Sequence, residues 1–283
     1  MSDIDPPRRP GPWDPRPEDG RAPVTPAVDP ARGAEAPLDQ GQHPVWALIS
    51  TLLLGGLIYY WSGSVVIVAA VLFGLLVHEY GHVLAMNRLG MGPARIYIVP
   101  FLGGLAKGQR LPVSEWHGVL VSLAGPAFGL LAAIPFYGLY LWSGQVVWLQ
   151  GVFAIAFINL INLAPAPPLD GSKALGPVLA RIHPMLEKVA LLAVGALAVL
   201  WGVSNGSWLF AGFLALALFS HLRRGAWRPE GRRLSWGEAA KSTGLFVLTT
   251  VACVGVGVAA LAPGVETLTE SLTHGARVFE FGR

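Results

Sequence analysis

Two histidines, His78 and His82, flank Glu79 in the pattern H-E-x-x-H, which is typical of hydrolytic metal sites. On a helix, residues four apart project from one face, so the two imidazoles can share a metal ion. Glu79 can hold or deprotonate a water at that metal. The preceding segment 65–77 carries no charged residue. Because ionisable groups are costly inside a membrane and usually mark function there, we interpret this motif as an intramembrane site.

A third metal ligand is expected elsewhere, because hydrolytic zinc sites usually combine three protein ligands with a water. Asp170 is the strongest candidate, since it closely follows an apolar run and precedes Gly171, which permits close backbone approach. The three prolines at 165, 167 and 168 interrupt regular helix there, which membranes tolerate only where protein or water satisfies the freed backbone groups. The ion itself stays open on residues alone, because two histidines and a carboxylate also suit iron.

The composition indicates a polytopic membrane protein with the lipid bilayer as its environment. Of 283 residues, 53% are hydrophobic and 13% are charged, whereas soluble domains average about 25% charged residues. The net charge of +3 is explained by basic residues beside membrane spans, so we expect no nucleic-acid binding. The single cysteine, Cys253, excludes an intrachain disulfide and a Cys-rich zinc site.

The pattern of apolar runs predicts an all-α polytopic fold with about six to seven transmembrane helices. Residues 1–44 are rich in proline and are predicted to form a disordered cytoplasmic tail. Next come a first transmembrane helix (45–63), a catalytic transmembrane core (64–185), additional helices (186–263) and a C-terminal tail (264–283). The predicted spans are 45–61, 64–88, 118–142, 146–165, 187–204, 207–222 and 244–263, of which 207–222 is short.

Basic and uncharged connections alternate along the chain, which predicts its orientation in the membrane. The positive-inside bias then places the N-terminus in the cytoplasm. Spans 64–88 and 146–165 both run inward, so the H-E-x-x-H motif and Asp170 are expected at the same cytoplasmic side.

Both motifs together resemble the site-2 protease family of intramembrane zinc metalloproteases. That family carries H-E-x-x-H in one core helix and N-x-x-P-x-x-x-x-D-G in a later one. The matching residues are His78, Glu79 and His82 in the first motif, and Asn162, Pro165, Asp170 and Gly171 in the second. Segments 100–105 and 124–126 also look like the family, so the resemblance covers about residues 64–185.

The resemblance implies a three-helix catalytic core and one zinc ion per chain, bound by His78, His82 and Asp170, with Glu79 as general base. It also implies a short extended hairpin-like segment near residues 95–106. By analogy, the substrate is a membrane-embedded protein, the transmembrane segment of a membrane-tethered regulatory protein, cleaved in a bacterial cell membrane. The oligomeric state stays open.

Gly129 departs from the family pattern, because many members have an asparagine there that can stabilise the oxyanion. Asn159 or Asn162 could supply that donor, or could support the core by interhelical hydrogen bonds. Gly103 and Gly104 are predicted to let a substrate strand pair with the hairpin-like segment.

Two other functions compete with proteolysis. Gly129 favours a non-catalytic membrane scaffold of the same fold that binds transmembrane helices without cutting them, whereas the intact Glu79 disfavours it. A zinc transporter is a weaker alternative, because transporters tend to show paired repeats and polar residues across several spans.

Overall fold

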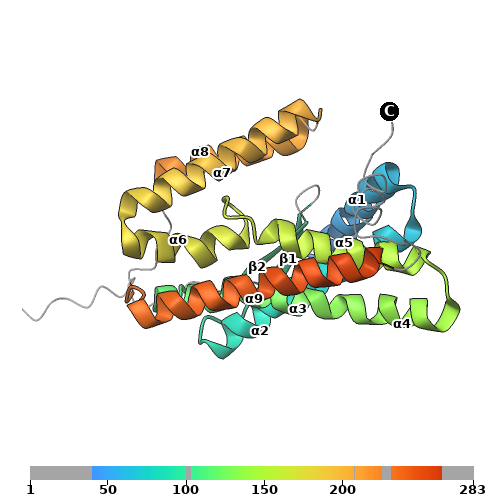
Figure 1. Ribbon diagram of the computed structural model, residues 1–283, viewed down its shortest axis with the longest axis horizontal. Helices are drawn as coiled ribbons and strands as arrows, with labels where there is room; N and C mark the ends of the chain where they lie inside the picture. The colour runs from blue at the N-terminus through green and yellow to red at the C-terminus, as the bar shows by residue number, and fades with distance from the viewer. Residues whose placement is uncertain (1–39, 100–102, 207, 225–230, 263–283) are drawn as a thin grey trace, which may run out of the picture. The chain divides into compact units, whose positions relative to one another are not determined.

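The computed structural model describes residues 40–99, 103–206, 208–224 and 231–262, and Figure 1 shows their arrangement. The predicted C-terminal tail (264–283) and nearly all of the predicted N-terminal tail (1–44) lie outside these residues. The described elements are α1 (Pro44–Ser62), α2 (Val65–Arg88), β1 (Arg95–Val99), β2 (Gly103–Lys107), α3 (Glu115–Gly129), the short 3-10 helix η2 (Leu130–Ala132), α4 (Ala133–Ser143), α5 (Val147–Asn162), α6 (Asp170–Ile182), α7 (Pro184–Ser204), α8 (Trp208–Arg224) and α9 (Trp236–Leu261).

Five helical segments among the described residues are long and apolar enough to cross a membrane. They are α1, α2, the continuous stretch from α3 through α4, α7 and α9. Helix α5 is equally apolar but has only 16 residues, and α8, at the predicted span 207–222, has 17. The predicted all-α polytopic membrane fold is confirmed.

Two helices differ from the sequence-based expectation. The last one, α9, begins at Trp236 instead of near 244, because Ser235 and Glu238 form a capping box ahead of the apolar run. Helix α6 lies between the predicted spans 146–165 and 187–204, where no helix is predicted, because the mixed composition and Pro177 give no apolar run although the 13 residues form an amphipathic helix. Asp170 is the first residue of that helix.

Helix α2 packs tightly between α3 and α5, and this packing fixes the position of the H-E-x-x-H motif (Figure 1). Ser64 caps its start by accepting a hydrogen bond from the backbone of Ile67. At Gly81 the backbones approach so closely that an added Cβ would lie 2.5 Å from the carbonyl oxygen of Ala124. The absence of a side chain at Gly81 therefore allows α3 to pack close to the histidines.

Two buried apolar clusters flank the motif and hold the helices together. One joins α2, η2, α4, α5 and α9, and the other joins α3, α6 and α9 with residues 163 and 234. Cys253 is buried and belongs to the second cluster. Polar bonds add to the second cluster, since Glu115 accepts from the backbone of Leu234 at 2.9 Å and Ser242 donates to the carbonyl of Ala174 at 3.0 Å.

The strands β1 and β2 form an antiparallel hairpin beside α2, which confirms the extended segment predicted near residues 95–106. Ile98 pairs with Gly104 in its register. The side-chain amide of Gln42 accepts from the backbone N–H of Ile98 (2.7 Å) and donates to its carbonyl (3.0 Å). Both backbone groups of Ile98 thus point away from β2, so antiparallel alternation turns those of Gly104 away from β1.

Candidate metal centre

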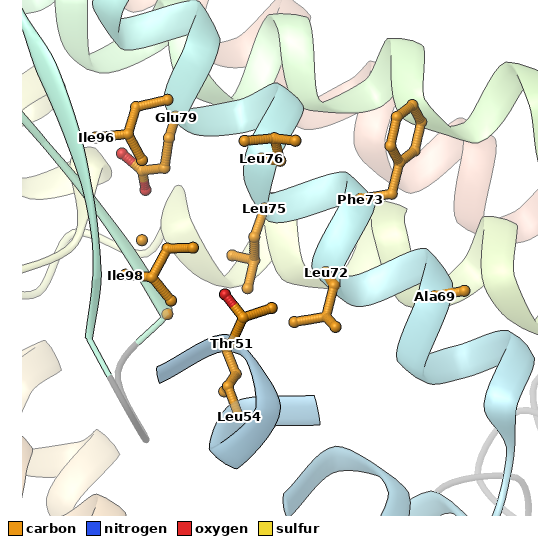
Figure 2. Close-up of a pocket in the computed structure, with 12 residues that line it drawn as sticks. Thr51, Leu54, Ala69, Leu72, Phe73, Leu75, Leu76, Glu79, Ile96 and Ile98 are labelled. Atoms are coloured by element: carbon orange, nitrogen blue, oxygen red, sulfur yellow. The ribbon is translucent and has the colours of Figure 1, made fainter. Parts of the chain in front are cut away.

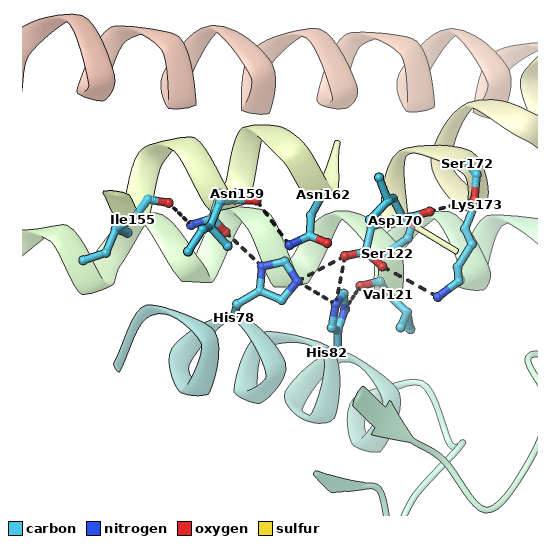
Figure 3. A network of polar contacts seen from close by, with 12 residues as sticks. His78, His82, Val121, Ser122, Ile155, Asn159, Asn162, Asp170, Ser172 and Lys173 are labelled. Atoms are coloured by element: carbon cyan, nitrogen blue, oxygen red, sulfur yellow. Dashed lines mark hydrogen bonds and ion pairs between the residues drawn. The ribbon is translucent and has the colours of Figure 1, made fainter. Parts of the chain in front are cut away.

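The two histidines and Asp170 meet inside the protein, as Figure 3 shows. His78 Nε2 and His82 Nε2 lie 3.1 and 3.2 Å from Asp170 Oδ2, and 3.1 Å from each other. The three residues are at most 7% exposed. Helices α2 and α6 therefore bring together the three side chains that the sequence singled out as ligands, across about ninety positions of the chain.

Hydrogen bonds on the far side of each ring determine which nitrogen carries the proton. His82 Nδ1 lies 2.8 Å from the carbonyl oxygen of Val121, which can only accept, so Nδ1 is the protonated atom. The amide nitrogen of Asn159 donates to the carbonyl of Ile155, so its Oδ1 faces His78 Nδ1 at 2.9 Å and accepts from it. In neutral rings, both Nε2 atoms then present lone pairs towards each other and towards a carboxylate oxygen.

This arrangement fits a divalent metal ion. Converging acceptors cannot hydrogen-bond one another, and they need a cation between them. Tetrahedral coordination with bonds of about 2.0 Å gives ligand separations of about 3.3 Å, close to the 3.1–3.2 Å found here. Gly125 of α3 keeps the space open, because a Cβ there would lie 2.4 Å from His82 Nε2 and 2.7 Å from His78 Nε2. Two imidazoles and one carboxylate are a ligand set that zinc accepts.

Glu79 lies beside this group and turns towards the hairpin (Figure 2). It is 6% exposed, and ligand atoms of His78, Glu79 and His82 all lie within 4.8 Å of one another. A Cβ on Gly104 would lie 2.3 Å from Glu79 Cγ and 2.7 Å from Oε1. Glycine at 104 is thus required for the carboxylate to occupy its position against β2.

The sequence also singled out Gly103, Asn159 and Asn162, and only Asn159 among them contacts a proposed metal ligand. Gly103 starts β2 with a φ of +99°, which favours glycine, and it lies next to Gly104. Asn159 is 1% exposed and contacts His78. Asn162 donates instead to the carbonyl of Ile158 on its own helix. One of the two amide N–H groups of each asparagine is thereby engaged within α5, and the oxyanion role considered for them stays a prediction.

An apolar pocket of about 430 Å³ opens next to Glu79, bounded by α1, α2 and both strands (Figure 2). Thr51 and Glu79 are the polar side chains among the described residues that line it. Ile96 and Ile98 point into it from the hairpin. The pocket therefore combines an apolar wall with a single carboxylate beside the proposed metal centre.

Three contacts at the site have partners that the sequence did not identify, although an interhelical hydrogen bond was one of the roles considered for Asn159. Lys173, one turn after Asp170, approaches Asp170 Oδ1 at 3.7 Å. The carbonyl of Val121 and the side chain of Asn159 orient the two imidazoles. Only the i, i+3 spacing of Lys173 could have been found in the sequence, because the other two contacts join separate helices.

Comparison with known proteins gives a family for the part of the chain that carries the motif. Residues 66–154 match the sequence profile described as Peptidase family M50. This segment is a peptidase family M50 segment. It includes the H-E-x-x-H motif and Gly125, whereas Asn159 and Asp170 lie beyond it. The resemblance to the site-2 protease family, to which M50 corresponds, is thereby confirmed.

A curated relative supports the M50 assignment. A Synechocystis sp. protein described as "Putative zinc metalloprotease" is 32% identical over 137 residues, which are 45% of this chain and 35% of that protein. The chain thus matches about a third of the length of this relative. The chain is a multi-pass membrane protein in which residues 66–154 match a metallopeptidase family.

Proposed function

We propose that the chain is an intramembrane zinc endopeptidase that cleaves transmembrane segments of membrane-tethered regulatory proteins. The observation that carries the proposal is the convergence of His78 Nε2, His82 Nε2 and Asp170 Oδ2 beside Glu79. The two histidines and Glu79 lie on α2, which is long and apolar enough to span a membrane. The substrate class comes from the resemblance to the site-2 proteases. The proposed orientation puts the N-terminus and the metal centre on the cytoplasmic side of a bacterial membrane.

Each residue of the centre has a defined task in this proposal. His78, His82 and Asp170 hold the ion, and Lys173 stays near the outer oxygen of the aspartate. A bound zinc ion supplies Lewis acidity towards the scissile carbonyl and the attacking water. Glu79 takes a proton from that water and returns it to the leaving amine, because it is a buried carboxylate beside the two imidazoles whose side chain turns towards the hairpin (Figure 2).

The hairpin and the apolar pocket support an extended, apolar peptide as the substrate. A helix hides its carbonyls in backbone hydrogen bonds, so a transmembrane substrate must unwind locally to be cut. Gln42 occupies the outer edge of β1 at Ile98, which leaves the β2 edge at Gly104 and Ala106 as the proposed partner of the unwound strand. Apolar side chains of that strand would enter the pocket next to Glu79.

The decisive test is Glu79→Gln, expressed with a membrane-tethered reporter that the parent protein cleaves. The variant keeps the size of the side chain and removes its basicity, so cleavage should fall by about 10²–10⁴-fold, the range that a general base contributes. Zinc content should stay at the parent level, because Glu79 is not a proposed ligand. Cleavage at the parental rate would show that Glu79 is not the base.

The scaffold alternative predicts a different result in that test. A helix-binding scaffold would bind the reporter equally well in the parent and in Glu79→Gln, and neither would release a product. Gly129 favoured this alternative in the sequence, but in the structure it adjoins the side chain of Asn159, where a Cβ would lie 2.2 Å from Oδ1. Glycine at 129 is therefore explained by its packing against Asn159, and it does not require that the protein has lost catalysis.

A further inference from the structure

We propose that Asn159 is the positioning residue of the metal centre and that Gly129 is the space that allows it to act. Asn159 Oδ1 accepts the Nδ1 proton of His78 and thereby fixes the ring with its Nε2 lone pair directed at the metal position. The proposal rests on the proposed metal site at His78, and it is independent of whether the protein cleaves peptides.

The amide of Asn159 is itself held in one orientation. Its nitrogen donates to the carbonyl of Ile155, one turn earlier on α5, at 2.8 Å. This bond leaves Oδ1 to face His78 Nδ1 at 2.9 Å (Figure 3). Asn159 is 1% exposed and His78 is 2% exposed, so water does not compete for either group. In the alternative ring tautomer, Nδ1 and Oδ1 would be two acceptors in contact, and Nε2 would carry the proton.

Gly129 makes this contact possible from the opposite helix. A Cβ at position 129 would lie 2.2 Å from Asn159 Oδ1 and 2.8 Å from its Cγ and Nδ2. Any side chain on α3 at this position would displace the amide from the ring. The departure from the family pattern at 129 is therefore coupled to Asn159: the buried amide is supplied by α5, and α3 provides the room.

The consequence is a higher affinity for metal. Partners that hydrogen-bond to the second nitrogen of a ligating histidine fix its tautomer and its orientation, and their loss typically costs 10–100-fold in metal affinity. Asn159 is the partner of His78, whereas the backbone carbonyl of Val121 has the same relation to His82. Only the His78 contact is made by a side chain and can be removed by substitution.

The test compares Asn159→Leu, Asn159→Asp and Asn162→Leu in the purified full-length protein. Zinc affinity is measured by competition with a chelator, and the bound Co²⁺ absorption spectrum reports the ligand field at the site. Asn159→Leu should weaken zinc about 10–100-fold and alter the Co²⁺ spectrum. Asn159→Asp keeps an oxygen acceptor, so it should retain affinity within a few-fold of the parent. Asn162→Leu removes a half-buried amide one turn away that bonds within its own helix, and it should retain the parental affinity and spectrum.

A parental zinc affinity and Co²⁺ spectrum in a folded Asn159→Leu would overturn the proposal, as would equal losses in Asn159→Leu and Asn162→Leu. If Asn159→Leu does not fold, Gly129→Ala provides the second test, because its methyl group displaces the same amide from the facing helix. Gly129→Ala should then weaken zinc binding as well, and unchanged affinity would contradict the proposal. His78→Ala distinguishes failure of the proposed metal site from failure of the positioning role. If His78→Ala binds zinc as tightly as the parent, the proposed metal site is wrong, and so is the role of Asn159.

Discussion

Gly125 lies against both imidazoles of the metal centre, where a Cβ would come within 2.4 Å of His82 and 2.7 Å of His78. The ligands alone therefore do not define the site. Gly104 and Gly129 have the same relation to Glu79 and Asn159. Each of these glycines leaves the volume that one or two functional side chains occupy.

We predict that Gly125→Ala weakens zinc binding by about tenfold or more, at the low end of what displaced ligand geometry costs. The added methyl group overlaps two rings that the close contact of Gly81 with α3 prevents from moving away. Gly118→Ala on the same helix is the matched control, because a Cβ there would meet nothing within 4 Å. Equal zinc content of the two purified variants would refute the close fit inferred here.

A second prediction concerns Gly104→Ala. Its methyl group would occupy the position of the Glu79 carboxylate, so cleavage of a tethered reporter should fall towards the level of Glu79→Gln, about 10²-fold or more. Zinc content should be retained, because Gly104 does not approach a proposed ligand. Loss of zinc together with activity would mean that the hairpin supports the ligands and not the base.

At the level of elements, the hairpin offers two edges that differ in their surroundings. The edge of β1 is engaged by Gln42, which lies just before α1 and bonds to both backbone groups of Ile98. The alternation of the ladder turns the backbone groups of Gly104 and Ala106 away from β1. A substrate strand that pairs with β2 would therefore pass next to Glu79.

Ala106→Pro tests this pairing. Proline removes the outward N–H of residue 106 without breaking a bond of the hairpin, because Ala106 faces Ile96 at a position of the register where the strands do not exchange hydrogen bonds. Reporter cleavage should drop about tenfold, as expected for the loss of a hydrogen bond whose partner stays buried. Ala106→Ser retains the N–H and should cleave at the parental rate; equal rates for the two variants would argue against pairing at β2.

The elements of the core could be predicted from the sequence because each carries a strong local signal. Charge-free apolar runs indicated α1, α2 and α5, and the resemblance to the site-2 proteases indicated the hairpin. Helix α6 was not anticipated, because a stretch with two glycines and Pro177 reads as a loop until tertiary packing holds it. The start of α9 was missed because its polar first turns depend on a cap rather than on hydrophobicity.

The candidate site was also predictable only in part from the sequence. Motif spacing predicted that His78, His82 and Asp170 would lie together, and their donor atoms do lie within 3.2 Å; their role as ligands stays a prediction. An interhelical hydrogen bond of Asn159 was considered from the sequence, but its partner His78 could not be predicted, because the contact depends on rotamers and on the space at Gly129 of a third helix.

For the molecule as a whole, the proposed metal centre and the apolar pocket are adjacent, because Glu79 lies beside the two histidines and also lines the pocket. The pocket of about 430 Å³ is walled by α1, α2 and the hairpin, and it ends at Glu79. We predict that Ala69→Phe, which narrows the pocket, reduces kcat/KM several-fold through a raised KM with kcat and zinc content unchanged, because it removes substrate binding that is equal in the ground state and the transition state. Val65→Phe, on the exposed start of the same helix, should have no effect on KM.

The most direct measurement is the position of the metal in an experimental structure of the zinc-loaded protein, located by anomalous scattering at the zinc edge. The account predicts one ion at about 2.0–2.2 Å from His78 Nε2, His82 Nε2 and an oxygen of Asp170. An ion bound elsewhere with these three side chains unengaged, or an aspartate turned away from the two imidazoles, would contradict it.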